Sequence, residues 1–432
     1  MPNHADWEFN GGRSLPIPYL TTGDPNLDRA FRIACGDLTS NLVPLRAAES
    51  LTHCPVTAER WQSLTARFAQ CTRLGELLPE NPRILVAGLD YGPFHFDSMM
   101  HAWDGASFVV PEGVRGGLLC ALQPEGERGI RGGPTSFLSG FGWTLAAWAH
   151  YLTTGSRAFL EVALAATLGD FAHGEEAEFD RETNLFRGPA IVGDGISAYP
   201  DFWAEGMQGV GHIVKWPDRF PQHRIPTGMG LPFCALSTNC INVAAYRIAA
   251  RMQEELGLPV DPTLEARAER LNAAINLHFW REDAGLYRYL VSPLGGSDQQ
   301  EGFGHAFAIL FGIASSAQKK RIIANLHITP NGIPINWPVY PRYESPDGMT
   351  YGNHNATVWP IVTGVWAEAM AQEGQVERFA LELKAHADRG CRDNQFAECY
   401  HPVSGKISGG IQEGRTGRTG EGLAAFIAAR LG

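Results

Sequence analysis

The pattern of apolar and polar positions predicts helices that come in neighbouring pairs. In each pair the first segment is apolar or small on nearly every side, whereas the second carries charges along one face. A helix that is apolar all round is buried on every side, and a one-sided pattern is typical of a surface helix. We therefore expect an inner helix followed by an outer helix in each pair. The four clearest pairs are Ser136–Thr153 with Ser156–Ala177, Leu231–Leu256 with Pro262–Phe279, Gln300–Ala314 with Ser316–Leu326, and Asn353–Gln372 with Gln375–Arg389.

Weaker helical patterns complete this series at both ends of the chain. We expect Asp24–Leu45 and Asp97–Leu122 to supply earlier helices and Thr419–Leu431 to form a last, apolar one. Glycines mark several of the expected helix ends, where the backbone needs a positive φ. These glycines are Gly155, Gly257, Gly374 and Gly390.

A degenerate local repeat follows the outer helices. Phe179–Phe186 and Phe279–Tyr287 share a turn-forming pattern, and Tyr400–Ile407 is a weaker third copy. Each is expected to be a turn leading into a short strand. Repeated helical hairpins with a buried inner helix predict a closed ring of hairpins. Long non-helical loops then follow the outer helices, at one end of the ring: Thr183–Gly230, Arg281–Gln299, His327–Gly352 and Cys391–Arg418.

Composition and charge exclude several classes of function. The chain has 432 residues, of which 44% are apolar, and its net charge is −11. This negative charge argues against a nucleic-acid partner, which needs a basic surface. No apolar window is long enough to span a membrane, and the N-terminus does not resemble a signal peptide. The eight cysteines form no CxxC pair, so we expect reduced thiols and a cytoplasmic location.

Aromatic, carboxylate and histidine side chains concentrate in the long loops. Aromatic rings cover the C–H face of a pyranose, and glycosidic cleavage needs a pair of carboxyl groups. We therefore expect a small carbohydrate partner, with the alternative that these rings only cap the core. The residues expected to bind it are Asp97, Trp143, Tyr199, Trp203, Glu301, His305, Trp337, Tyr340, Arg342, Tyr351, His354, Asn355 and Trp359.

Other chemistries leave weaker traces in the sequence. The GxG pairs lack a third glycine at dinucleotide-binding spacing, and no GxSxG, phosphate-loop or HExxH motif occurs. His95, Asp97 and His101 match no standard metal spacing, so we expect neither a metal nor a cofactor. His305 lies in an expected inner helix, where it is either a satisfied core histidine or a sugar ligand.

Four segments resemble, in order, those of the six-hairpin glycosidases, the clan of trehalases, mannosyl-oligosaccharide glucosidases, debranching enzymes and α-L-rhamnosidases. The most specific is Tyr351–Gly364, which resembles the clan element Y-x-N-H-(G/A)-x-V-W-P-(F/W)-V-T-G, and Asp180–Pro200 resembles its D-G-I-x-x-Y-P loop. Leu236–Asn242 and Glu301–Gly312 also fit. The resemblance implies an all-α fold, an (α/α)6 toroid of six helical hairpins with short strands in the long loops. We expect residues 26–432 to form this single barrel and residues 1–25 to pack on it.

The resemblance also implies inverting hydrolysis by two carboxylates. Asp194, in the D-G-I-x-x-Y-P loop, matches the general acid, and Glu398, which precedes Tyr400, matches the general base. Asp201 or Glu205 could equally be the acid.

Three hypotheses follow for the activity. The first is an exo-acting glycosidase on a short oligosaccharide or glycoside. The second is a sugar epimerase or polysaccharide lyase on the same barrel, with His305, His354 or Tyr351 as base. The third is a non-catalytic carbohydrate-binding protein, whose loop carboxylates would point outward or pair with arginines such as Arg342. The sequence sets neither the sugar, its anomer and linkage, nor the oligomeric state.

Overall fold

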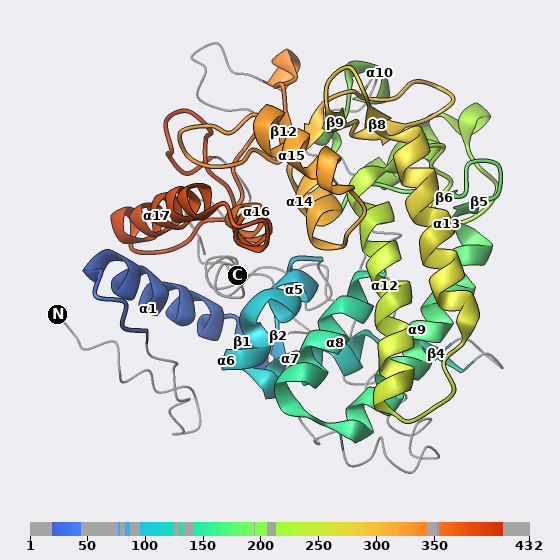
Figure 1. The fold of residues 1–432 in the computed structure, drawn as a ribbon, viewed down its shortest axis with the longest axis horizontal. Coiled ribbons are helices and arrows are strands. Elements are labelled where there is room, and N and C mark those ends of the chain that lie inside the picture. Colours follow the sequence, from blue (N-terminus) through green and yellow to red (C-terminus); the bar gives the residue numbers. More distant parts are fainter. Residues whose placement is uncertain are drawn as a thin grey trace.

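Helical hairpins follow one another around a ring in chain order (Figure 1). The computed structural model describes residues 20–44, 77, 83–86, 96–124, 129–132, 141–193, 195–204, 213–343, 352 and 354–408. In Figure 1 the chain runs from the blue α1 through cyan, green and yellow to the red α17, which returns to lie beside α1. The predicted ring of hairpins is therefore confirmed over the described part of the chain.

Four hairpins of the ring are those expected from the sequence. They are α8 (Gly142–Thr154) with α9 (Arg157–Ala177), α12 (Leu236–Glu255) with α13 (Pro262–His278), α14 (Gly302–Leu310) with α15 (Ser316–Asn325), and α16 (Pro360–Gln372) with α17 (Val376–Asp393). Before them come α1 (Pro25–Ser40), α5 (Phe96–His101), a π-helical turn (Ala102–Ala106), α6 (Ser107–Val109) and α7 (Pro111–Ala121).

Burial separates inner from outer helices as the pattern predicted. In α14 all residues from Gly302 to Ile309 are buried, whereas its partner α15 buries only Ile322 and Ile323. The apolar faces of α12, α14 and α16 meet in one large cluster, and those of α1, α7 and α8 in a second. The core therefore lies between the two layers of the ring.

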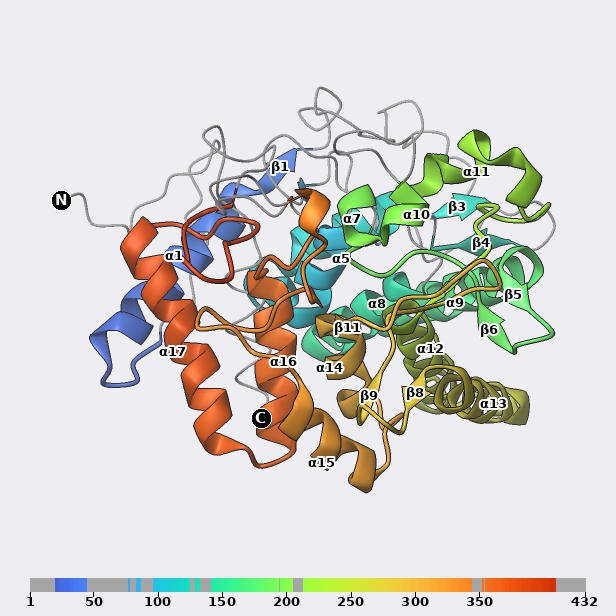
Figure 2. The ribbon, with the colours of Figure 1, turned by 90° about the horizontal axis from the view of Figure 1, so that it is seen from above.

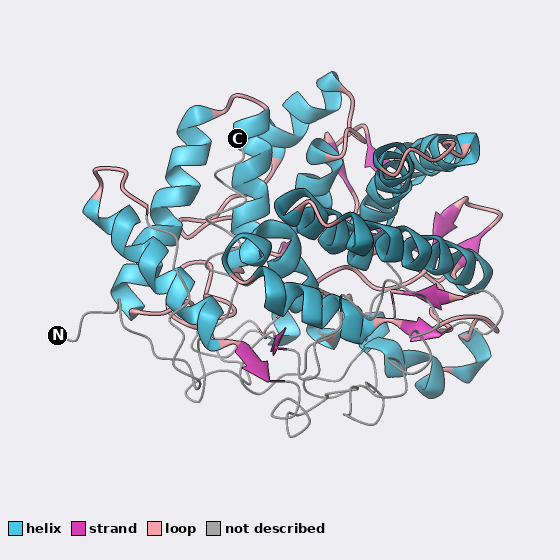
Figure 3. Cartoon of the chain, turned by 90° about the horizontal axis from the view of Figure 1, so that it is seen from below, coloured by secondary structure: helices cyan, strands magenta, loops and turns pink. Residues whose placement is uncertain are grey.

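The described strands are short, and they form two-stranded antiparallel sheets (Figure 3). The pairs are β1 (Leu42–Pro44) with β2 (Arg83–Leu85), β3 (Gln123–Pro124) with β4 (Ile130–Arg131), β5 (Phe179–Asp180) with β6 (Leu185–Phe186), β7 (Cys234–Ala235) with β10 (Leu290–Val291), β8 (Trp280–Arg281) with β9 (Leu286–Tyr287), and β11 (Gln300–Glu301) with β12 (Asn336–Trp337). The connection from α9 to α12 also holds α10 (Asp201–Ala204) and α11 (Trp216–Arg219). Figure 2 shows α10 and α11 on one side of the ring and the α16–α17 turn on the opposite side.

The local repeat is confirmed in all three copies. The first two are the hairpins β5–β6 and β8–β9, and in the third Tyr400 bridges to Ile407. At the same position of each copy a residue has a left-handed backbone: Asn184, Gly285 and Gly405, with φ of 56°, 66° and 67°. Asparagine and glycine tolerate this conformation best, which explains why the repeat is visible in the sequence.

Several predicted helix ends are corrected by the structure. The helix expected from Leu231 begins at Leu236, because Cys234–Ala235 pair with β10. The helix expected from Asn353 begins only at Pro360. Gly155, Gly257 and Gly374 do adopt the expected positive φ at helix ends.

The glycine expected to end the last described helix lies inside it instead. Gly390 belongs to α17, which continues to Asp393 and ends at Asn394 with φ 53°. A β-carbon at Gly390 would run into the ring of Phe396, so close packing explains this glycine. The expected helix Thr419–Leu431 lies outside the described residues, as does most of the expected extension 1–25.

One glycine in α9 and one in α1 allow a test of this packing. A β-carbon at Gly169 in α9 would overlap the carbonyl oxygen of Ile130, whereas one at Gly36 in α1 would meet nothing within 4 Å. We expect Gly36→Ala to raise the free energy of unfolding by about 0.5–1 kcal/mol, because alanine is the better helix former. Gly169→Ala should lower it by about 1–3 kcal/mol, because backbone must move. Urea unfolding of both variants checks this, and an equal loss in both would contradict it.

Candidate active site

The loop that carries the predicted acid is tightly packed on both sides of position 194. The Tyr199 hydroxyl donates a hydrogen bond to the Gly193 carbonyl. A β-carbon at Gly193 would lie 2.9 Å from the Tyr199 hydroxyl and 3.0 Å from that of Tyr289. At Gly195 it would overlap the imidazole of His354. A side chain at either position would clash with these neighbours, so both positions need glycine. Asp194 itself and Glu205 lie outside the described residues.

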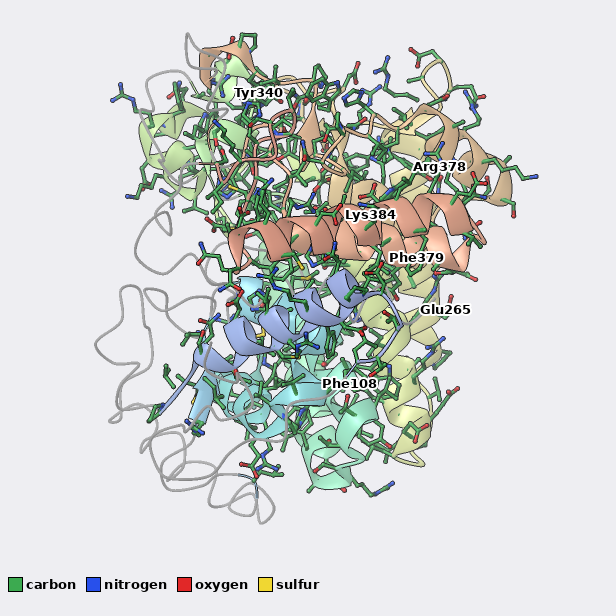
Figure 4. The ribbon with its side chains drawn as sticks, turned by 90° about the vertical axis from the view of Figure 1, so that its left-hand side faces the viewer. Phe108, Glu265, Tyr340, Arg378, Phe379 and Lys384 are labelled. Carbon is green, nitrogen blue, oxygen red and sulfur yellow. The ribbon has the colours of Figure 1, made fainter. Side chains whose placement is uncertain are left out.

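Arg342 ties a second loop to this one. Its guanidinium forms an ion pair with Asp201 and donates to the carbonyl oxygen of Tyr199. The same group lies 5.2 Å over the ring of Tyr340, which Figure 4 labels among the loops beyond α17. Asp201, an alternative acid in the sequence, thus has its carboxylate engaged in a contact between loops. This pairing is the one that the carbohydrate-binding hypothesis expected.

One short segment joins the loops of the two predicted catalytic carboxylates. The amide of His354 donates to the Ser197 hydroxyl at 3.2 Å, three residues from Asp194 in sequence. Val358 exchanges two backbone hydrogen bonds with Tyr400, at 2.9 and 2.8 Å, two residues from the half-buried Glu398. Four residues span at most about 14 Å when extended. Ser197 and Tyr400 are thereby held to neighbouring points of the same segment.

Buried asparagines hold these loops to the ring. The Asn239 side chain on α12 bonds both the amide and the carbonyl of Phe186, and that of Asn355 does the same for Tyr340. Asn336 accepts from the amide of Ala356 and donates to the carbonyl of His354. A side-chain amide offers the same donor and acceptor as a peptide group. Each asparagine therefore makes the hydrogen bonds that a neighbouring strand would otherwise make. Asn355, predicted to bind substrate, is thus committed to loop structure.

Glu301 is the most deeply buried of the predicted carboxyls whose side chains the structure describes. It is 3% exposed and accepts the amide hydrogen of Ser237, the second residue of α12, at 3.0 Å. Burial raises the pKa of Glu301 to about 8, and the bonds from Ser237 oppose that rise. The carboxyl therefore holds a proton at neutral pH and links the starts of two inner helices.

His305 is the satisfied core histidine of the two alternatives. Its Nδ1 bonds the carbonyl of Glu301 at 2.8 Å, and its Nε2 accepts the amide hydrogen of Tyr287 at 3.1 Å. Complete burial lowers its pKa to about 4, so the ring stays neutral. No ring nitrogen is left for a sugar or for base catalysis.

The tryptophans of the predicted set differ in position. Trp143 is 1% exposed in the core cluster of α1, α7 and α8, and its indole donates to the carbonyl of Leu118 at 3.1 Å. The substrate contact expected of Trp143 thus gives way to a packing role. Trp359 is also buried and donates to Thr357, whereas Trp203 packs on Trp216 within the α9–α12 connection. The half-buried Trp337 stacks on His327, with ring centroids 4.2 Å apart.

Besides Asp194 and Glu205, two more predicted residues are not described at the side-chain level. Tyr351 lies outside the described residues, and so does the side chain of Asp97, whose backbone belongs to α5. Among the residues that the structure does describe, no three histidine, cysteine or carboxylate side chains gather in a way that could hold a metal ion. None of the described helices is both long and apolar enough to cross a membrane.

The ring, its loops and the carboxylates along them define the class, a six-hairpin glycosidase with an (α/α)6 toroid fold. The family model described as the mannosylglycerate hydrolase MGH1-like glycoside hydrolase domain matches residues 141–418. The chain therefore belongs to this glycoside hydrolase family. Among curated protein sequences, none matches it.

Solved structures show the same fold at low sequence identity. A mannosylglycerate hydrolase of family GH63 from Thermus thermophilus, in complex with Tris, is 15% identical, with a TM-score of 0.62 over 84% of this chain and 99% of that one. The neutral trehalase Nth1 from Saccharomyces cerevisiae is 12% identical, with a TM-score of 0.60 over 94% of both chains. A GH78 rhamnosidase from Bacillus sp. GL1 is 13% identical, with a TM-score of 0.52 over 94% of this chain and 35% of that one.

The buried Glu301 carboxyl predicts a pH dependence of stability. Its pKa is raised on folding from about 4.5 to about 8, so its contribution is complete below pH 4.5 and is lost as the pH rises towards 8. We expect Glu301→Gln to reduce the fall in melting temperature between pH 5 and 8.5 by about 2 °C or more. Thermal unfolding at both pH values measures this. Identical pH profiles for the variant and the parent would contradict it.

Proposed function

We propose that this glycosidase is exo-acting on a short oligosaccharide or glycoside and inverts the anomeric configuration. Asp194 is the general acid in this proposal and Glu398 the general base. The observation that supports it best is the segment from His354 to Val358, which bonds the loop of Asp194 at Ser197 and the loop of Glu398 at Tyr400. An inverting pair needs its carboxyl groups about 6.5–9.5 Å apart, with a water between one of them and the sugar.

The chemistry follows from the two roles. The Asp194 carboxylic acid gives its proton to the glycosidic oxygen as the bond to the anomeric carbon breaks. The Glu398 carboxylate takes a proton from water, whose oxygen attacks the anomeric carbon from the opposite face. The products are an alcohol and a sugar of inverted configuration, and both carboxyl groups are restored by proton exchange with solvent.

The proposed substrate class is a glycoside in which the sugar is linked to a small polar group. The matching family model is named for mannosylglycerate hydrolysis, and the related structures from Thermus thermophilus are complexes with Tris, glucose and D-glycerate. Mannosylglycerate is therefore the first compound to test, beside simple disaccharides and aryl glycosides. The epimerase and lyase alternatives lose His305 as a base, since both of its ring nitrogens bond the main chain.

The acid and base roles predict different responses to the leaving group. We expect Asp194→Asn and Glu398→Gln each to lower kcat/KM on an alkyl glycoside by about 10³-fold or more. On a glycosyl fluoride Asp194→Asn should recover most of its activity, because fluoride leaves without a proton. Glu398→Gln should stay inactive there, because the water still needs a base. Steady-state kinetics measures both, and NMR of the first product anomer tests inversion.

A matched control lies in the same connection between α9 and α12. Asp218 is exposed and pairs with Arg224 at 2.9 Å, so Asp218→Asn should leave kcat/KM unchanged. If Asp201→Asn rather than Asp194→Asn shows the fluoride-rescued loss, the acid is Asp201. Full activity of Glu398→Gln on the alkyl glycoside would reject the base assignment.

A further inference from the structure

A carboxylate from the first described helix reaches the loop of the predicted base. Asp37 lies on α1 and is 4% exposed, and its Oδ2 accepts the amide hydrogen of Phe396 at 2.7 Å. Phe396 stands two residues before Glu398 and 359 positions after Asp37. Figure 4 shows the reason for this contact, because α1 and α17 lie side by side where the ring closes. The N-terminal part of the chain thus touches the segment that carries the candidate base.

Tyr400 fixes the same segment from the other side. Its hydroxyl accepts the amide hydrogen of Ala397 at 2.9 Å, and its own amide and carbonyl bond Val358. The Arg389 guanidinium lies 5.2 Å over the tyrosine ring. Both amides before Glu398 and both main-chain groups of Tyr400 are therefore held. The backbone on either side of Glu398 is hydrogen-bonded to Asp37 of α1 and to Val358, two residues before α16, and Arg389 of α17 lies over the Tyr400 ring.

Burying the Asp37 carboxylate costs free energy, which is an argument that its bond to the loop helps to position Glu398. A buried carboxylate is unfavourable unless its charge is met by strong hydrogen bonds, and Asp37 directs one of its bonds to a loop amide. A general base must stay within hydrogen-bond reach of its water, and a displacement of about 1 Å can cost about 100-fold in rate. An anchored backbone limits such displacement.

We propose that Asp37 and Tyr400 are positioning residues for the carboxylate of Glu398. The proposal rests on the base role given to Glu398 above. Asp37 accepts the hydrogen of the Phe396 amide, and Tyr400 accepts that of the Ala397 amide. Together these two bonds set the direction of the Glu398 side chain. Neither residue exchanges a proton with the substrate.

The test compares kcat and KM on an alkyl glycoside and on a glycosyl fluoride. We expect Asp37→Ala and Tyr400→Phe to lower kcat about 10- to 100-fold on both substrates, with KM within about threefold. Activity falls on both because water needs the base whichever group leaves. Asp37→Asn keeps an acceptor oxygen for the Phe396 amide and should lose less than Asp37→Ala. If Asp37→Ala does not fold, Asp37→Asn and Tyr400→Phe carry the test.

Two control variants remove similar contacts elsewhere in the ring. Asp170 on α9 is also a buried aspartate of an outer helix that accepts a loop amide hydrogen, from Gly132 at 3.1 Å. The buried Tyr246 hydroxyl donates to Glu175 at 2.6 Å. Asp170→Asn and Tyr246→Phe should lower the melting temperature as much as their counterparts do, with kcat within about twofold of the parent.

Three outcomes would overturn the proposal. They are a normal kcat in Asp37→Ala and Tyr400→Phe, a loss on the alkyl glycoside that the fluoride restores, and an equal loss of kcat in the Asp170 control. Failure of the base assignment itself gives a different result, an active Glu398→Gln enzyme, and is therefore separable from failure of the positioning role.

Discussion

Satisfying the backbone of buried loops is the constraint on which the rest of this structure depends. The connections from outer to inner helices run partly inside the protein, where each amide and carbonyl needs a partner. The strands along them are only two or three residues long, so main-chain pairing supplies some of those partners and leaves others to side chains. Asn239, Asn336 and Asn355 supply them from side chains, all three at most 1% exposed. The loops thereby become a rigid surface on which a sugar site can be built.

The same constraint applies where the ring closes. The ring ends where α17 lies beside α1, and the loop after α17 contacts α1 through Phe396. Asp37 gives a carboxylate oxygen to that loop, much as the asparagines give amides to the others. Asp37 and Glu301 both accept main-chain amide hydrogens, and burial raises the pKa of Glu301.

The order of the helices and their burial could be predicted from the sequence, because both follow from the local periodicity of apolar residues. The repeat from Phe179 was also visible, since Asn184 and its glycine counterparts need a left-handed backbone. The helix ends near Leu231 and Asn353 were not, because strand pairing and side-chain amides override an apolar pattern there. Periodicity cannot register a hydrogen bond between segments distant in the chain.

The sequence predicts which loops carry the candidate site, but it does not show which of their residues already bond the main chain. His305, Asn355 and Trp143 have the chemistry of sugar ligands, yet each bonds the main chain. Polar residues that bind sugars are the same types that satisfy buried backbone, so composition alone does not separate the two uses. Asp37 had no signal at all, because it stands in a helix outside every loop motif. Ser197 occupies an unspecified position of the D-G-I-x-x-Y-P loop, so the motif does not mark its side chain.

The bond between Asp37 and Phe396 also bears on how the chain folds. Its two partners are separated by most of the polypeptide, so the contact closes a very long loop and comes late. During synthesis α1 leaves the ribosome long before the last hairpin, so its contact with α17 can form only late. The loop of Glu398 therefore reaches its final geometry only when the two ends of the ring have met. Enzymatic activity in a refolding experiment would report on that final closure, after most of the helices have formed.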